Sequence, residues 1–316
     1  MKFLYAMPIH RRLILFLLGV LALTCVISPW LALGADWFTT FWPTLRSERI
    51  PFSRVFNRAF MISAVVLFIL LRRFFIDGCI KELISVRFAG ASRDLFTGLG
   101  LAVGSMIFLA AAMTASDIFT PFFRVSFTRA LTRIATATMA GISVGAIEEL
   151  FFRGMLFKGL RDQGNALRAY MAANLFYSVL HFVKPGEAYF LDGIEPLAGF
   201  SHLLASFNPF LDPVPLLPGI FGLFIIGLVL SYALVRSGNL YLGIGLHAGW
   251  VFSLKTMRVF GDFTRDDLGW VFGSTDPKIV SGVATWFGIL LVGVAVHFLT
   301  RNRAARSADP LHARAV

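Results

Sequence analysis

The sequence predicts an all-α polytopic membrane protein with about eight transmembrane helices. The chain has 316 residues, of which 57% are hydrophobic and 15% are charged, and its mean hydropathy is +0.74. A soluble domain has roughly 45–50% apolar and about 25% charged residues. Because the chain also contains 34 Phe residues, much of its surface must face lipid. This composition excludes an ordinary soluble enzyme, a disordered protein and a disulfide-stabilised secreted module.

The placement of the basic residues favours a membrane location over nucleic-acid binding. The formal net charge is +11, but the lysines and arginines stand at the ends of apolar segments and in the tail after Thr300. Lys and Arg flank membrane spans in this way, and no basic stripe with interleaved aromatic residues is present. The two cysteines, Cys25 and Cys79, have the spacing of neither a metal site nor a disulfide framework.

A transmembrane helix needs about 20 mostly apolar residues, and this criterion gives the predicted helices in order. Long apolar stretches without charge are found at 13–35, 95–116, 213–235, 237–254 and 279–300. Shorter apolar stretches are found at 59–71, 134–147 and 169–183, and these could instead be re-entrant. The first stretch is longer than the ~7–15 apolar residues of a signal peptide, so we interpret it as a retained helix.

An even number of spans places both termini on the same side of the membrane. In the long loop 184–214, Lys184 is the only lysine or arginine, whereas cytoplasmic loops carry an excess of them. Both termini, including the basic tail after Thr300, are therefore predicted to be cytoplasmic. The loop is rich in Phe, Leu, Pro and acidic residues. It is predicted either as an interfacial or re-entrant element, with a short helix near 196–207, or as a simple amphipathic connector.

Three ionisable residues, Glu148, Glu149 and Arg153, lie close together in one apolar segment. Each ionisable group inside a bilayer costs about 2.5–3.5 kcal/mol on insertion scales, so each one requires an explanation. At about 100° per residue, Glu149 and Arg153 share a helix face and can form an ion pair. Glu148 points away from that face and needs a partner on another helix. Alternatively, all three residues form a purely structural polar contact between helices.

Two histidines in later spans are candidate partners for Glu148. The turn after the acidic helix is predicted near Gly164, which places Glu148 and His181 at about the same depth in an antiparallel helix pair. His247 lies in an otherwise uncharged span that contains several glycines, and glycines allow another helix to approach closely. Either histidine alone would more often be an interhelical hydrogen-bonding residue than a catalyst. Together with an intramembrane glutamate, they indicate a site that could activate water.

Two other histidines are not matched with the intramembrane glutamate. His202 is predicted as a residue of the 184–214 loop, and His297 as a residue at the end of the last span. We therefore expect neither of them in the site.

Over roughly residues 130–255, the chain resembles a known family. The resemblance lies in the acidic segment and the two histidine segments. The pattern is Glu148-Glu149-x-x-x-Arg153, then an aromatic residue four positions before His181, then His247. It resembles the CAAX prenyl protease and bacteriocin-processing family of intramembrane proteases, which includes the type II prenyl-protein endopeptidases. The resemblance implies a four-helix catalytic core. It also implies three regions: N-terminal helices at 1–125, the core at 126–258, and a last helix with a basic tail at 259–316.

The resemblance implies a role for each matched residue. Glu148 would be the general base, and His181 would help to position and activate the attacking water. His247 would bind the scissile carbonyl, while Glu149 and Arg153 would hold their helix in register. The implied substrate is a peptide or protein that is embedded in the bilayer or anchored to it by a lipid. Hydrolysis inside a membrane needs a base that can remove a proton from water and donors for the developing oxyanion.

The chain departs from the family pattern at two positions. Tyr177 stands where the family usually has Phe. Val251 stands where an Asn or Asp normally follows the last histidine by four positions, so an expected oxyanion or water contact is missing. Asn174, on the helix before His181, is a candidate substitute for that contact.

Other functions remain open at the level of sequence. Glu148, His181 and His247 could also hold a divalent metal such as zinc with one open position, although no His-Glu-x-x-His motif is present. The main alternative to a protease is a non-catalytic membrane immunity or assembly factor of the same fold, which the Val251 substitution favours. A third hypothesis is a proton-coupled transporter that uses Glu148 and His181 as a proton relay.

Overall fold

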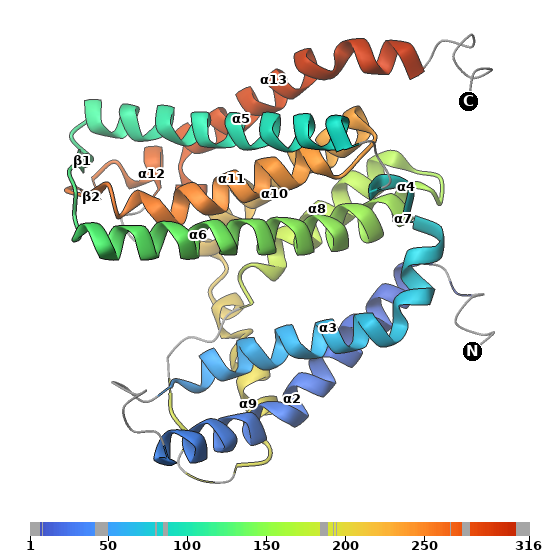
Figure 1. Ribbon diagram of the computed structural model, residues 1–316, viewed down its shortest axis with the longest axis vertical. Coiled ribbons are helices and arrows are strands. Elements are labelled where there is room, and N and C mark those ends of the chain that lie inside the picture. Colours follow the sequence, from blue (N-terminus) through green and yellow to red (C-terminus); the bar gives the residue numbers. More distant parts are fainter. Residues whose placement is uncertain are drawn as a thin grey trace. The chain divides into compact units, whose positions relative to one another are not determined.

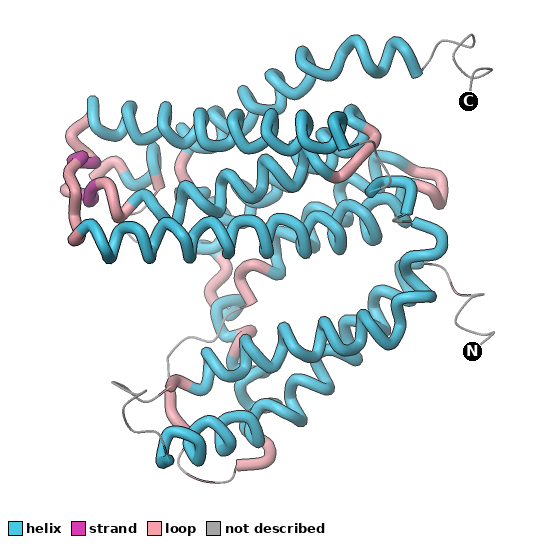
Figure 2. The backbone as a smooth tube through the Cα atoms, viewed as in Figure 1, coloured by secondary structure: helices cyan, strands magenta, loops and turns pink. Residues whose placement is uncertain are grey.

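The computed structural model is almost entirely helical (Figure 1 and Figure 2), which confirms the predicted all-α fold class. The structure describes residues 7, 9–41, 50–79, 81–84, 88–183, 189–191, 193, 195–265, 267–273 and 279–307.

The chain forms two compact units, which we describe separately. One unit consists of Met1–Asp77 and Val179–Leu216, and the other of Gly78–Ser178 and Leu217–Val316. The regions 1–125, 126–258 and 259–316 follow the family resemblance rather than the packing of the chain, and they stay a prediction.

Among its described residues, the first unit has two long helices and three short ones. They are α2 (Ile9–Phe41), α3 (Phe52–Cys79), α9 (Ala198–Ala205), η3 (Asn208–Leu211) and η4 (Val214–Leu216). Helix α9 packs against α2, where a side chain at Gly199 would overlap the backbone of Cys25. The buried apolar core consists of Cys25, Ala32, Phe52, Val55, Phe56, Leu191 and Ala198.

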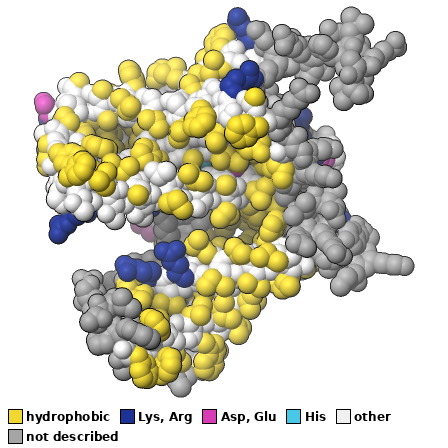
Figure 3. All heavy atoms as spheres, viewed as in Figure 1, with side chains coloured by type: hydrophobic (Ala, Val, Ile, Leu, Met, Phe, Trp, Pro, Cys, Tyr) yellow, Lys and Arg dark blue, Asp and Glu magenta, His cyan; other side chains and the backbone are white. Residues whose placement is uncertain are grey.

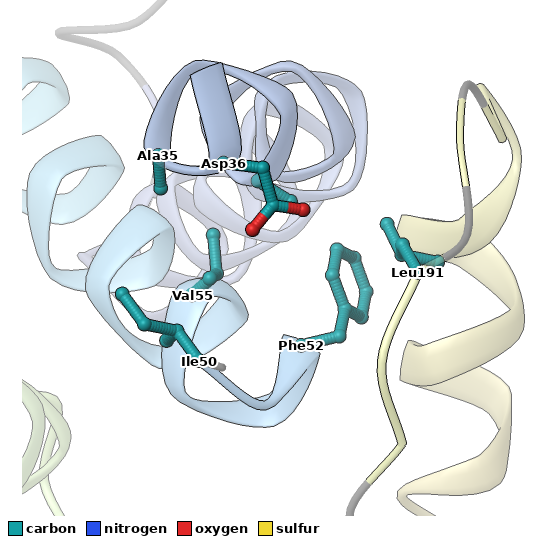
Figure 4. A pocket seen from close by; sticks show the side chains of 7 residues that line it. Ala35, Asp36, Ile50, Phe52, Val55 and Leu191 are labelled. Carbon is teal, nitrogen blue, oxygen red and sulfur yellow. The ribbon is translucent and has the colours of Figure 1, made fainter. Parts of the chain in front are cut away.

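A small cavity of about 10 Å³ lies beside this core. In Figure 4 the carboxylate of Asp36 is turned toward the side chains of Val55 and Phe52 that line the cavity. The volume is close to the minimum that holds one water molecule. A single water is therefore enough to fill the space next to the carboxylate.

His202 lies within the 184–214 segment, as predicted, and is buried in this unit. It lies on α9 and is 1% exposed. Its ring contacts Phe52, Phe56 and Tyr189 at centroid distances of 5.3, 4.7 and 5.5 Å. Burial lowers the pKa of His202, because the charged form of the ring is poorly solvated there.

The 184–214 loop contains more helical structure than a simple connector. Helix α9 confirms the predicted short helix near 196–207, and η3 follows it. Lys184 lies outside the described residues. Whether the loop lies in the membrane interface stays a prediction.

The second unit contains the site and most of the long helices. They are α5 (Phe88–Ala115), α6 (Phe127–Glu148), α8 (Ala166–Leu180), α10 (Leu217–Ser237), α11 (Tyr241–Met257) and α13 (Val283–Ser307). Short helical segments join them: α4 (Lys81–Ile84), η2 (Glu149–Phe157), α7 (Lys158–Arg161), α12 (Gly269–Phe272) and η5 (Ile279–Ser281).

A two-stranded antiparallel sheet closes one end of this unit. Strand β1 (Phe119–Pro121) pairs with β2 (Gly261–Phe263), and Phe119 stands opposite Phe263. Because β1 connects α5 to α6 and β2 follows α11, the sheet ties these three helices together at one end (Figure 1).

Helix α11 packs between α5 and α6 (Figure 1), and glycines line both contacts. On the α5 side, a side chain at Gly245 would overlap the carbonyl oxygen of Leu95. On the α6 side, a Cβ at Gly141 would stand 2.7 Å from the carbonyl oxygen of Ala248. Small residues allow such close packing between membrane helices, where burial of apolar surface from water cannot drive association.

Residues 127–161 form one uninterrupted helical rod, because α6 continues directly into η2 and α7. Exposed threonines of α6 donate their hydroxyl protons to the backbone carbonyls four residues earlier, so that Thr132 bonds Thr128, Thr136 bonds Thr132 and Thr138 bonds Ile134. These bonds satisfy the hydroxyls where lipid offers no partner. The rod ends at the predicted turn, where Gly164 has a φ of 122°, a value that favours glycine.

Each of the eight predicted spans coincides with a helix, and two of these helices are short. In the described part of the chain, six segments are long and apolar enough to cross a membrane: Arg11–Phe38, Phe52–Leu71, Phe88–Ala115, Phe127–Arg161, Val214–Ser237 and Val283–Arg301. The short helices are α8, with 15 residues, and α11, with 17. At 1.5 Å per residue these span about 22 and 26 Å, less than the ~30 Å hydrocarbon core.

Large apolar side chains are exposed on the long helices, as expected for a surface that faces lipid. Phe108 on α5 is 72% exposed, Met139 on α6 is 66% exposed and Phe287 on α13 is 63% exposed. Figure 3 shows hydrophobic side chains over much of the visible surface of the second unit. Such an extensive apolar surface would favour aggregation in water. The chain is therefore an integral membrane protein.

We predict that Gly245→Ala destabilises the second unit, because the new methyl group must displace backbone atoms of α5. The free energy of unfolding should fall by about 1–3 kcal/mol, the usual cost of overpacking. Thermal unfolding of the purified protein in detergent measures the change. Gly104→Ala on α5 is the matched control, because a Cβ there meets no atom within 4 Å. Equal melting temperatures for the two variants would contradict the prediction.

Candidate active site

The acidic residues of the predicted site lie where α6 passes into a π-helix. Glu148 is the last residue of α6, and Glu149 is the first residue of η2. A π-helix has i→i+5 hydrogen bonds, is rare, and occurs frequently at functional sites. In such a turn, residues four apart are separated by less than one full turn. Glu149 and Arg153 therefore lie nearly above one another along the helix axis.

The predicted ion pair between Glu149 and Arg153 is confirmed. Arg153 Nη1 donates a hydrogen bond to Glu149 Oε1 at 3.0 Å, and the side chains are 0% and 1% exposed. The ring of Tyr177 on α8 lies 4.3 Å from the guanidinium carbon of Arg153, a favourable contact for a desolvated cation. A buried charge is tolerated only when it is paired in this way.

His247 on α11 also contacts the Glu149 carboxylate of this pair. Its Nδ1 atom lies 2.9 Å from Glu149 Oε1, so one carboxylate oxygen contacts both the arginine and the histidine. The ring also meets Tyr177 edge-on, with centroids 6.3 Å apart and an interplanar angle of 88°. Three elements, η2, α8 and α11, thus fix the orientation of the imidazole.

Glu148 reaches the other ring nitrogen of the same histidine. Its Oε2 atom lies 3.7 Å from His247 Nε2. The Glu148 side chain is 26% exposed, whereas that of Glu149 is 1% exposed. Because Glu148 Oε2 itself is covered, the exposed part of the side chain comes from its other atoms. The two neighbouring carboxylates therefore occupy different environments on the two sides of one imidazole.

A glycine on α11 makes room for Glu149. A Cβ at Gly243 would stand 2.9 Å from Glu149 Oε2. Any side chain at this position would therefore push the carboxylate away from His247, which is one helical turn further along α11. Glycine here brings the acidic helix and the histidine helix close enough for the hydrogen bond to form.

Asn174 connects α8 to α10 and makes its described contacts away from the histidine. Its Nδ2 atom donates to the carbonyl of Tyr170 at 2.9 Å, and its Oδ1 atom accepts from Ser231 Oγ at 3.0 Å. Gly227 leaves space for this amide, because a Cβ there would stand 2.8 Å from Asn174 Oδ1. A role for Asn174 in binding an oxyanion stays a prediction.

Two further residues that the sequence singled out are His181, which follows α8, and Val251, which lies within α11. His181 is the first residue after α8 and belongs to the part of the chain assigned to the first unit, so its predicted partnership with Glu148 stays a prediction. Val251 lies on α11, one turn after His247, and is half-buried.

In the described part of the chain, no three His, Cys, Asp or Glu side chains are grouped so that they could hold a metal ion. The His247 Nδ1 atom, which would be one candidate ligand atom, is already bonded to Glu149.

Sequence reasoning missed two features of the site. The hydrogen bond from His247 to Glu149 joins residues 98 positions apart, and the sequence pattern had paired Glu149 only with Arg153. The contact of Tyr177 with the guanidinium was also not foreseen, although an aromatic residue four positions before a histidine was part of the motif. For the hydrogen bond between His247 and Glu149, the sequence contained one signal. It was the glycine at position 243, which marks the place where α11 approaches another helix.

Comparison with known proteins agrees with the resemblance described above. Residues 130–253 match the family model described as "Type II CAAX prenyl endopeptidase Rce1-like". No curated protein and no solved structure matches the chain. The match covers the acidic segment, Tyr177, His181 and His247. The similarity to the Rce1-like type II CAAX prenyl endopeptidases therefore extends over residues 130–253, which is less than half of the chain.

Proposed function

We propose that the chain is an intramembrane endopeptidase that hydrolyses a peptide bond of a membrane-embedded or lipid-anchored substrate. The family match supports a protease of this general type. In the proposed reaction, Glu148 removes a proton from water, and the resulting hydroxide attacks the scissile carbonyl. The observation that carries the proposal is the row of charged contacts Glu148–His247–Glu149–Arg153, in which only the side chain of Glu148 is partly exposed.

The charges of this cluster leave one proton to be shared. Arg153 is always protonated, and it balances the charge of Glu149 at 3.0 Å. Glu148 and His247 then form a neutral pair when they hold one proton between them, on either the carboxylate or the imidazole. A low-dielectric environment favours such a neutral arrangement. In the proposed reaction the pair starts without this proton, accepts it from water to reach the neutral arrangement, and later returns it to the leaving amine.

The imidazole is held in one orientation for this task. When Glu149 accepts a hydrogen bond from Nδ1–H, the Nε2 atom of His247 faces Glu148. Glu149 then plays the part of the third residue that orients a catalytic histidine in hydrolases. The partly exposed side of Glu148 is left to meet water and substrate. His181 is proposed to position the water, as the resemblance implies.

A non-catalytic assembly or immunity factor is the second candidate, and Val251 is the observation that favours it. This residue cannot donate a hydrogen bond to an oxyanion, and it stands one turn after His247. If the protein is a protease, another donor must stabilise the tetrahedral intermediate. We propose that His247, as an imidazolium donating from Nε2, takes this part after the proton has been transferred.

We predict that Glu148→Gln abolishes proteolysis while the protein still folds. The amide keeps the size of the side chain but cannot accept the proton, so the cleavage rate should fall by about 10²–10⁴-fold. Membrane proteins that accumulate uncleaved in cells without this chain identify the substrate. Re-expression of the variant should leave that substrate uncleaved. Normal processing by Glu148→Gln would contradict the protease, and rescue of another cellular phenotype without processing would favour the assembly factor.

We predict that Glu149→Gln destabilises the protein more than Glu148→Gln does. The substitution leaves the buried Arg153 charge without a counter-ion, which typically costs about 3–5 kcal/mol. Glu148 is partly exposed, so its replacement should cost much less. Thermal unfolding of both variants in the same detergent measures the difference. A larger loss of stability in Glu148→Gln would contradict the assignment of Glu149 to the structural role.

We predict that Gly243→Ala lowers activity with only a small change in stability. The new methyl group would meet the flexible end of Glu149 at 2.9 Å, so the carboxylate can move aside. This movement would lengthen the bond to His247, and a misplacement of about 1 Å can reduce the rate by about 10²-fold. Gly104→Ala is the control, because its Cβ meets open space. Unchanged cleavage by Gly243→Ala would argue against the orienting role of Glu149.

A further inference from the structure

The ends of α10 and α13 carry a group of polar and basic side chains that the proposed reaction does not use. The helices run parallel, and their contacts pair Val229 with Gly293 and, further along, Tyr232 with His297. The Tyr232 hydroxyl and His297 Nδ1 are 2.6 Å apart. Both helices belong to the second unit, and their predicted spans end together, the last one at Arg301.

The cations of this group have no acidic partner among the described residues. Arg236 Nε donates to Thr300 Oγ1 at 3.2 Å, and its guanidinium lies 6.0 Å from the centre of the Tyr232 ring. These contacts leave both terminal nitrogens of Arg236 available. Arg301 is exposed, and it lies one helical turn after His297 on the same face of α13. Two arginines, Arg236 and Arg301, therefore lie where the helices leave the apolar region.

An exposed apolar stripe runs along α13 from this basic group toward the middle of the span. Phe287, Leu290 and Val294 are 63%, 52% and 50% exposed, and they share a helix face with Arg301. Leu290 and Arg301 are eleven positions apart, which corresponds to about 16 Å along the helix. This is about half of the ~30 Å hydrocarbon core, the depth of one lipid leaflet. Figure 3 shows Lys and Arg side chains beside hydrophobic ones on the second unit.

We propose that this end of α10 and α13 binds the phosphate group of an anionic phospholipid, whose acyl chains lie along the α13 stripe. The two arginines can each donate paired hydrogen bonds to phosphate oxygens. In the proposed site the Tyr232 hydroxyl donates to His297 Nδ1, which leaves the ring proton on Nε2 for a further bond to phosphate. Basic pockets between transmembrane helices bind anionic lipid headgroups for the same reasons. The site is independent of the proposed peptidase reaction.

The first test measures lipid binding to the full-length protein in neutral detergent micelles. Phosphatidylglycerol should bind more tightly than phosphatidylcholine with the same acyl chains, because only the former carries a net negative charge. Arg301→Gln should weaken phosphatidylglycerol binding about fivefold, as expected for one basic residue near the membrane surface, and should leave phosphatidylcholine binding unchanged. Arg133→Gln on α6 is the matched control, because Arg133 is also an exposed helix arginine. It should have no effect.

The outcomes distinguish a specific lipid-binding site from non-specific electrostatic attraction of anionic lipid. Equal losses in Arg301→Gln and Arg133→Gln would mean that net charge alone attracts lipid, and would overturn the proposal. Equal binding of the two lipids would overturn it as well. If inorganic phosphate competes as strongly as the whole lipid, the site binds a free anion and the α13 stripe has no role. This result would overturn the proposal of a phospholipid site. Leu290→Ser should weaken lipid binding but not affect phosphate, and thermal unfolding of each variant checks that the fold is intact.

Discussion

Two carboxylates on consecutive residues of a membrane-embedded helix require cationic or hydrogen-bonding partners, and this requirement organises the second unit. Arg153, on the same helical rod, pairs with Glu149 at 3.0 Å. His247 contacts Glu149 at 2.9 Å and Glu148 at 3.7 Å. Because each unpaired charge would cost several kcal/mol in the bilayer, these contacts determine which helices must meet and at what depth. The site and the packing of the unit therefore have the same cause.

The close approach that these contacts need is provided by glycines on both sides of α11. Gly141 of α6 and Gly243 of α11 bring the acidic helix near, and Gly245 brings α5 near on the opposite side. A helix held on two sides in this way cannot slide or rotate without backbone overlap. The position of His247 is thus fixed by the backbones around it as well as by its own hydrogen bond. Such pre-organisation is what a catalytic histidine requires.

Local features of the fold and the site could be predicted from the sequence, and features that join distant segments could not. The spans follow from composition, and the Glu149–Arg153 pair follows from a spacing of four residues within one helix. The contact of His247 with Glu149 depends on which helices become neighbours, which no local pattern specifies. Similarly, the burial of His202 depends on aromatic residues from other segments. The π-helix at Glu149 also had no sequence signal, because its extra width depends on how the neighbouring helices pack.

The different surroundings of the two glutamates argue for a division of roles between them. Glu149 is 1% exposed and has one oxygen engaged by both Arg153 and His247. Moving a proton onto this carboxylate would leave the arginine charge without its counter-ion, so Glu149 is poorly suited to be the base. Glu148 is 26% exposed, and its Oε2 atom lies 3.7 Å from the far nitrogen of the imidazole. Protonation there leaves the Arg153 pair intact, and His247 can exchange the proton with it. The same residue spacing that gives Glu149 a buried partner thus leaves its neighbour partly exposed, as the proposed role of Glu148 as a base requires.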